Sequence, residues 1–397
     1  MSRLKYKIFI VIIILFGIAS GFYIYKTHYS HEEVESNTTV TLWYAEDDSL
    51  NACIPDIADE FNAIDDKNVK KNITVNIRSF ENYGELEKAL SLTRRSSGPD
   101  MIVCDANHAA ILKDKGHTAE LAEYFDEWNY AEFNSYFVKC ISVDGNLAAV
   151  PYAADIELMI VNEKYVSDAD DISSLEDLCS AAKNYYKQNS KPMFSIGDYA
   201  KFFRTAMAQL GEEFNAVSPR NTTNENCKYI YKLLAQSAFD RGMISSKDPM
   251  KAVISGDIPC AIVSSSEIMA HASELGKNIK IYACPCVEEG KQVYNPDVKG
   301  ICICKTNTNR QNAAAEFIKW FISADINSKF VSDNGYIPVS GSISELSSDN
   351  AIFANLKKVI SNLESKAKHT NYAPNIEYVN NYDEFVDVME LVMDSLS

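Results

Sequence analysis

Residues 146–164, NLAAVPYAADIELMIVNEK, decide the fold of this chain. They contain two short apolar runs, Leu147–Val150 and Ile156–Val161, separated by Pro151–Asp155. Proline fixes its own φ and donates no backbone hydrogen bond, so it is disfavoured inside a central strand. The pattern therefore predicts one strand that leaves a sheet, a crossing at Pro151–Asp155, and a second strand that enters another sheet. We interpret the crossing as a hinge between two lobes, with a ligand bound in the cleft that it spans.

Strands and helices alternate before this stretch. β-branched and apolar residues predict strands at Val40–Tyr44, Ile73–Ile77 and Asp100–Cys104. Helical periodicity follows each strand, near residues 54–64, 83–95 and 106–116. This order predicts a parallel sheet with helices on both faces.

The parallel sheet predicts where a ligand binds. In open parallel sheets, ligands lie beyond the carboxyl ends of the strands, where the strand order reverses. In the common order 2-1-3, the first and third strands are neighbours, so the turns after both strands meet at one edge. These turns are Tyr44–Asp48 and Asp105–Asn107, which bring carboxylates and an aromatic ring to that edge.

The alternation resumes after the crossing. Helices are expected at 174–188, 198–210, 224–239 and 310–323, and strands at 259–264, 279–284 and 301–304. Residues 298–300 mark a second crossing, and residues 335–338 break the chain before a helical C-terminus. The fold class is therefore α/β with two lobes, each a sheet flanked by helices. The expected divisions are 1–26 as membrane anchor or signal peptide, 27–39 as linker, 40–152 plus 299–332 as the first lobe, and 153–298 plus 333–397 as the second lobe.

Length and charge limit the possible functions. A chain of 397 residues is long enough for two domains. Its net charge of −17 excludes a nucleic-acid partner, because such partners require basic patches.

The N-terminus carries a targeting signal. Basic residues precede the apolar run Ile8–Tyr25, which is long enough for a short membrane span. A cleaved signal peptide is the alternative, but the apolar run continues past the small residues Gly17 and Ala19 that could frame a cleavage site. We favour a single-pass anchor in the cell membrane, with the bulk of the chain extracellular.

The ten cysteines leave three interpretations open. Cys284 with Cys286, and Cys302 with Cys304, form two Cys-x-Cys pairs of the kind found in zinc sites. Disulfides are the second possibility. Because both pairs lie in strand-like apolar runs, buried thiols that pack as small hydrophobic side chains are the favoured interpretation.

An enzyme is not predicted. The sequence has no G-x-S-x-G, P-loop, H-E-x-x-H or G-x-G-x-x-G pattern, and its six histidines are dispersed. Two carboxylates facing a sugar could act as a glycosidase pair, but only the distance between them would support that interpretation. We expect no catalytic residues and no cofactor.

Six stretches in register resemble the extracellular solute-binding proteins of ABC importers, in the large family of maltose-, oligosaccharide- and polyamine-type receptors. These stretches are Val40–Tyr44 with the acidic turn after it, Gly98–Val103, Gly145–Lys164, Val253–Ser266, Ile301–Phe330 and Gly335–Pro338. The resemblance implies a two-lobed periplasmic-binding-protein-like fold that closes on a solute. It also implies crossings between the lobes near Tyr152, Val298–Gly300 and Asn334–Tyr336.

The resemblance implies a set of ligand-binding residues at the cleft. The first and third turns, the hinge, the start of one helix and the last crossing contribute to it. These residues are Tyr44, Glu46, Asp47, Asp105, Asn107, Tyr152, Asp155, Ser265 and Tyr336.

The sequence departs from the family pattern at two points. The first cysteine is Cys53, so no lipobox cysteine ends the apolar N-terminal segment. Many sugar-binding relatives also have a tryptophan near the second crossing, where this chain has Val298-Lys299-Gly300-Ile301-Cys302.

The predicted function is an extracytoplasmic receptor that captures a small organic solute and delivers it to ABC permease subunits. The expected solute is a carbohydrate, followed by a polyamine, which the acidic residues at the cleft favour. The alternative is a membrane-anchored ligand-sensing or adhesion module of the same fold that is not coupled to transport.

Overall fold

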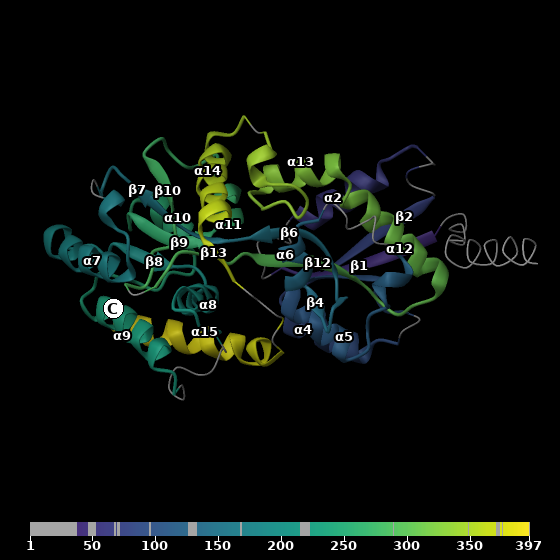
Figure 1. Cartoon of the computed structure of the whole chain (residues 1–397), viewed down its shortest axis with the longest axis horizontal. Helices are drawn as coiled ribbons and strands as arrows, with labels where there is room; N and C mark the ends of the chain where they lie inside the picture. The colour runs from purple at the N-terminus through teal and green to yellow at the C-terminus, as the bar shows by residue number, and fades with distance from the viewer. Residues whose placement is uncertain are drawn as a thin grey trace, which may run out of the picture.

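Two β-sheets form the framework of the protein, and in Figure 1 the first lies to the right and the second to the left. The computed structural model describes residues 38–46, 53–66, 69, 72–94, 97–125, 133–166, 169–214, 223–288, 290–347, 349–370, 374 and 376–396. The predicted anchor or signal peptide, residues 1–26, lies outside these residues. Within them, none of the helices is both long and apolar enough to cross a membrane.

The first sheet has the strand order β2-β1-β3-β12-β6. β1 (Thr38–Ala45), β2 (Ile73–Phe80) and β3 (Met101–Asp105) run parallel. β12 (Asp297–Ile303) is antiparallel to both of its neighbours, β3 and β6 (Val150–Asp155). The expected 2-1-3 order is confirmed, and β12 makes the sheet mixed rather than purely parallel.

Alternating side chains of this sheet face two layers of helices. Trp43 packs in the cluster with α4 and α5, whereas its neighbour Leu42 packs with α2 and α12. Buried apolar residues on both faces explain why the central strand β3 is apolar up to Asp105, whereas the edge strand β2 is partly polar and exposed. The helices are α2 (Ile54–Asn62), α4 (Tyr83–Leu92), α5 (Ala106–Asp114) and α12 (Thr308–Phe321).

The second sheet has the order β10-β7-β9-β8. β7 (Glu157–Asn162) is antiparallel to β10 (Ile279–Ala283) and β9 (Cys260–Ser264), while β8 (Phe194–Ile196) is parallel to β9. Helices cover both of its faces as well. One face carries α7 (Leu175–Asn189), α8 (Tyr199–Gln209) and α9 (Glu225–Phe239), and the other carries α10 (Pro249–Ser255), α11 (Ser265–Ala270) and α14 (Ala351–Lys366).

The C-terminal helix α15 (Ile376–Leu396) packs on α8 and α9 and also contacts α5 beside the first sheet (Figure 1). Its Phe385 ring lies 5.1 Å from the rings of Phe203 and Phe214, measured between centroids. The remaining elements are η3 (Leu121–Glu123), α6 (Ser135–Cys140), β4 (Ser142–Val143), β5 (Asn146–Leu147), η5 (Ala169–Asp171), β11 (Val293–Tyr294), α13 (Ala324–Asn334), η6 (Ile343–Glu345) and β13 (Lys368–His369).

Three connections between the sheets lie side by side at the end of β6. Ile156 alone separates β6 from β7. β12 begins at Asp297, which is the register partner of Asp155. Ile337 exchanges two backbone hydrogen bonds with Ala154, at 2.8 and 3.0 Å. The end of β6 is therefore where the chain passes between the two sheets.

The predicted crossing at Pro151–Asp155 is wrong, because these residues form β6 itself. β6 is the last strand of its sheet, and an edge strand tolerates proline. The first sheet thus extends past Tyr152, where the first lobe was expected to end. The second expected crossing, residues 298–300, likewise lies inside β12.

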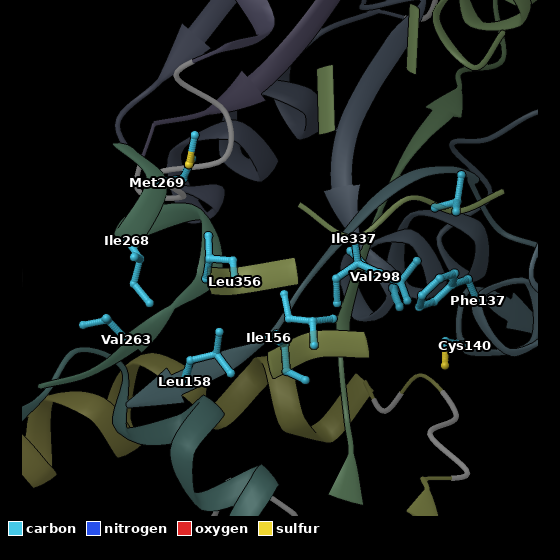
Figure 2. Close-up of a cluster of buried hydrophobic side chains, with 14 of the residues drawn as sticks. Phe137, Cys140, Ile156, Leu158, Val263, Ile268, Met269, Val298, Ile337 and Leu356 are labelled. Carbon is cyan, nitrogen blue, oxygen red and sulfur yellow. The ribbon is translucent and has the colours of Figure 1, made fainter. Parts of the chain in front are cut away.

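One hydrophobic cluster continues from the first sheet through the connections into the second. Figure 2 shows Val298 and Ile337 on one side of Ile156, and Leu158 and Val263 on the other. The connections are therefore packed within a shared apolar core.

A close backbone approach accompanies the third connection. Gly335 ends α13 with φ +73°, in the left-handed region. A Cβ atom there would lie 2.5 Å from Cβ of Met269 on α11. Only glycine combines this backbone conformation with this contact.

Candidate functional site

The ends of strands from both sheets meet beside the connections at the end of β6, and we call this place the junction. β3 and β6 end there at Asp105 and Asp155, and α8 and α11 begin there after β8 and β9. Contacts between these ends bring polar side chains from both sheets together. We call this set the junction site: Asp105, His108, Asp155, Glu157, Lys201, Arg204, Ser265, Ser266, Asp297 and Lys299.

Asp105 and His108 form a pair at the start of α5. Asp105 caps the helix, since its Oδ1 accepts the backbone N–H of His108 at 2.8 Å, and its Oδ2 lies 2.9 Å from His108 Nδ1. The Tyr83 ring stacks on the imidazole with centroids 3.7 Å apart.

The pKa values of this pair move apart. Burial raises the pKa of Asp105, but the charge and hydrogen bonds of His108, with the charge of Lys299, lower it below the usual range. Burial lowers the pKa of His108, but the charge of Asp105, its hydrogen bond and the charge of Glu87 together outweigh burial, so the pKa of His108 is raised. Both shifts favour the ionised pair.

A row of alternating charges continues from this pair to α8. Lys299 is the register partner of Asp105, and its Nζ lies 3.0 Å from Oδ2 of Asp297. Oδ1 of Asp297 lies 3.4 Å from Nη1 of Arg204, and Oδ2 lies 3.9 Å from Nζ of Lys201. We call these five residues the charge ladder. It connects α5 of the first sheet to α8 of the second.

The ladder is held in a buried environment. Asp297, Lys299 and Arg204 expose 7%, 3% and 6% of their surface. Burial raises the pKa of Asp297, but Lys299, Arg204 and Lys201 together lower it to about 2. Asp297 is therefore ionised and balances cations from both sheets.

Asp155 makes a second link between the sheets. Its Oδ1 accepts from Ser265 Oγ at 2.5 Å and from the backbone N–H of Ser266 at 3.2 Å, and its Oδ2 accepts from Ser266 Oγ at 2.6 Å. Its Oδ1 also accepts the N–H of Ile156 at 2.9 Å. The carboxylate thus holds the first turn of α11 against the end of β6.

A family model described as bacterial extracellular solute-binding protein matches residues 56–355, which is well over half of the chain. The chain belongs to this family. The expected family resemblance is confirmed, and membership of an extracellular family puts the folded part of the chain outside the cytoplasm.

Individual relatives of this solute-binding protein are distant. A maltotriose-binding protein of Pyrococcus abyssi is 22% identical over 285 residues, covering 69% of this chain and 61% of its own. The chain thus spans less than two thirds of that relative's length.

Solved structures show the same fold. The GacH receptor of Streptomyces glaucescens, whose structures include an acarbose complex, superposes with a TM-score of 0.72 at 16% identity, covering 91% of this chain and 95% of its own. A maltotriose-bound binding protein of Thermus thermophilus gives 0.66 at 14% identity, covering 90% and 97%. The predicted α/β fold of periplasmic-binding-protein type is confirmed.

The junction site contains three of the nine ligand-binding residues expected from the sequence: Asp105, Asp155 and Ser265. Asp155 and Ser265 contact each other directly, while Asp105 joins the charge ladder. All three hold helix starts or strand ends in place, so their side chains have structural contacts in addition to any contact with solute.

The expected tyrosines lie in apolar packing. Tyr152 is fully buried, with its ring 5.2 Å from Phe321, and the Tyr336 ring stacks on Phe330 at 5.4 Å. Tyr44 belongs to the same cluster. Their place in the core of the first sheet explains why they are absent from the junction site.

Glu46 and Asn107 are the two other expected residues that the structure describes. Glu46 is exposed after β1, where its N–H donates to Phe80 O at 2.8 Å. Asn107 is buried in the first turn of α5. Asp47 lies outside the described residues.

Several junction residues were missed by sequence analysis. Arg204 and Glu157 each interrupt an otherwise apolar stretch, FFRTAM and IELMIV, and Asp297 with Lys299 places two charges on one face of a strand. Charges inside buried elements are rare unless they are paired or functional. That signal could have identified them.

The Cys-x-Cys pairs are not arranged as a metal site. Cys302 and Cys304 are buried in and after β12, and burial raises the pKa of the Cys304 thiol. In the part of the chain that the structure describes, no group of three or more His, Cys, Asp or Glu side chains could hold a metal ion. Buried thiols of this kind fill space as small apolar groups.

Proposed function

We propose that this solute-binding protein captures a short oligosaccharide at the junction site and delivers it to the permease subunits of an ABC importer. The charge ladder is the observation that supports this proposal. Its charged groups, contributed by both sheets, can form charge-assisted hydrogen bonds to sugar hydroxyls, which both donate and accept. The ligand of the maltotriose-binding relative agrees with this class of solute.

We further propose that the two sheets belong to lobes that close on the solute by a hinge motion. The expected boundaries, 40–152 plus 299–332 and 153–298 plus 333–397, would move to the end of β6. Rotation would centre on Ile156, the start of β12 and Ile337. A solute that contacts both ends of the charge ladder would favour the closed state.

The solute class is tested by calorimetric titration of the protein with maltose, maltotriose and spermidine. We expect an oligosaccharide to bind with an affinity that hardly changes between low and high salt, because its partner is uncharged. Binding of spermidine alone, weakened by salt, would instead assign the site to polyamines.

Matched lysine variants locate the binding. Lys201→Met at the junction is expected to weaken oligosaccharide binding by about tenfold or more. Lys183→Met removes an exposed lysine of α7 that pairs with Asp240, the residue after α9, and should leave the affinity unchanged. Equal effects of the two variants on the affinity would argue against the junction site as the place where the oligosaccharide binds.

The protein is proposed to be held at the membrane by residues 1–26, whose apolar run is uncleaved. Membrane fractions washed at alkaline pH should retain the full chain and release a variant that lacks these residues. Recovery of a shortened chain in the soluble fraction would show a cleaved signal peptide instead.

A further inference from the structure

Glu157 is a buried carboxyl group with one oxygen atom that none of the described residues hydrogen-bonds. It is the first residue of β7 and exposes 6% of its surface. Among the described residues, none makes a hydrogen bond to its Oε2. Buried polar atoms in folded proteins are nearly always hydrogen-bonded, so an unsatisfied oxygen at this depth points to a partner that arrives from outside.

Strand geometry directs Glu157 toward the junction. Alternation along β7 puts it on the same face as Met159 and Val161, which is the face that α8 covers. Its register partner in β9 is Ser264, the residue that caps α11. Glu157 therefore lies where α8 and α11 both begin.

The charges around Glu157 come from three elements at this edge. They belong to Lys201 and Asp198 of α8, Asp155 of β6 and Glu267 of α11. Lys201 also contacts Asp297 of the charge ladder. Glu157 is thus next to the ladder without being part of it.

This environment favours the neutral acid. Burial raises the pKa of Glu157 well above its usual value; Lys201 opposes this, while the nearby carboxylates add to it. A protonated carboxyl group has one O–H donor and remaining acceptor capacity, and an alcohol hydroxyl likewise donates and accepts. A ligand with a permanent positive charge would not meet a fully ionised carboxylate at Glu157.

We propose that Glu157 is a solute-binding residue that hydrogen-bonds a hydroxyl group of the bound solute and thereby selects neutral, hydroxyl-rich ligands. This assignment rests on the proposed oligosaccharide-binding function. It adds a specificity determinant on β7 of the second sheet.

The test compares three variants by calorimetric titration with maltose and maltotriose, and by urea unfolding. Glu157→Leu removes both hydrogen-bonding functions, and we expect a loss of affinity of about 30-fold. Glu157→Gln keeps a donor and an acceptor, so its loss should stay below about tenfold. Glu163→Leu, just past the far end of β7, is the control and should bind as the wild type does.

The outcomes separate the two proposals. A wild-type protein that binds neither sugar overturns the oligosaccharide function, and the Glu157 assignment falls with it. A wild-type protein that binds, with unchanged affinity in Glu157→Leu, overturns only the assignment. Loss of cooperative unfolding in both Glu157→Leu and Glu157→Gln would make Glu157 a structural residue and would also overturn the assignment.

Discussion

We expect Asp297→Ala to lower the free energy of unfolding by about 4 kcal/mol, because it leaves buried cations without their counter-charge. Asp297 lies 3.0 Å from Nζ of Lys299 and 3.4 Å from Nη1 of Arg204, and both partners are almost fully buried. Removing one member of a buried ion pair costs more than the pair itself contributes, since the remaining charges keep their desolvation penalty.

The same residue makes stability depend on pH in the acid range. Its pKa of about 2 lies below the value of about 3.9 in an unfolded chain, which corresponds to about 2.6 kcal/mol. Because the folded pKa is the lower one, this stabilisation is complete above about pH 4 and is lost as the pH falls through about 2. The variant should lack this part of the acid transition.

Urea unfolding at pH 7 and pH 3 measures both effects. Asp240→Ala is the control, because Asp240 pairs with Lys183 at 2.9 Å on a more exposed surface. Its loss should stay below about 1 kcal/mol. The charge ladder would not stabilise the junction if the two variants lost similar free energies of unfolding. The same conclusion would follow if Asp297→Ala lost as much stability between pH 7 and pH 3 as the wild type does.

Asp155→Ala is expected to cost about 3 kcal/mol or more, because four hydrogen bonds to one buried carboxylate disappear together. The hydroxyls of Ser265 and Ser266 and the Ser266 N–H would lose a charged acceptor in an environment with little water. The contact between β6 and α11 would weaken in the same step.

The Asp155 prediction is checked by urea unfolding together with amide hydrogen exchange. The Ser266 amide should exchange faster in Asp155→Ala, because its acceptor is gone. Asp248→Ala is the matched control: Asp248 caps α10 by accepting from the N–H of Lys251 at 2.9 Å, at a more exposed position. It should cost about 1 kcal/mol. Equal costs would remove Asp155 as a link between the sheets.

Local pattern determined most of the individual elements. The capping box of Ser174 and Asp177 marked the start of α7, and Asp198 and Asn224 cap α8 and α9 at their predicted starts. Side-chain periodicity and capping act over three or four residues, so they can be recognised without knowing the fold. The 2-1-3 order followed from the alternation of strands and helices, because short right-handed crossovers leave few other arrangements.

Local sequence pattern was insufficient where the structure depends on pairing and packing with residues distant in the sequence. Pro151 suggested a break, but its strand is at the edge of a sheet, a position that only the pairing reveals. Tyr152 and Tyr336 were placed at the ligand by their position along the chain. The Tyr152 ring packs against Phe321, because the face that a strand residue occupies depends on the register of the whole sheet. The Tyr336 ring, which follows α13, stacks on Phe330.

The sequence by itself thus determined the α/β class and the family. Only the tertiary structure decided which charges meet at the junction. Arg204 contacts Asp297 across 93 positions of the chain, and Asp155 contacts Ser265 across 110. Such pairs have no local signature, since a charge in an apolar stretch requires some partner but does not specify which one.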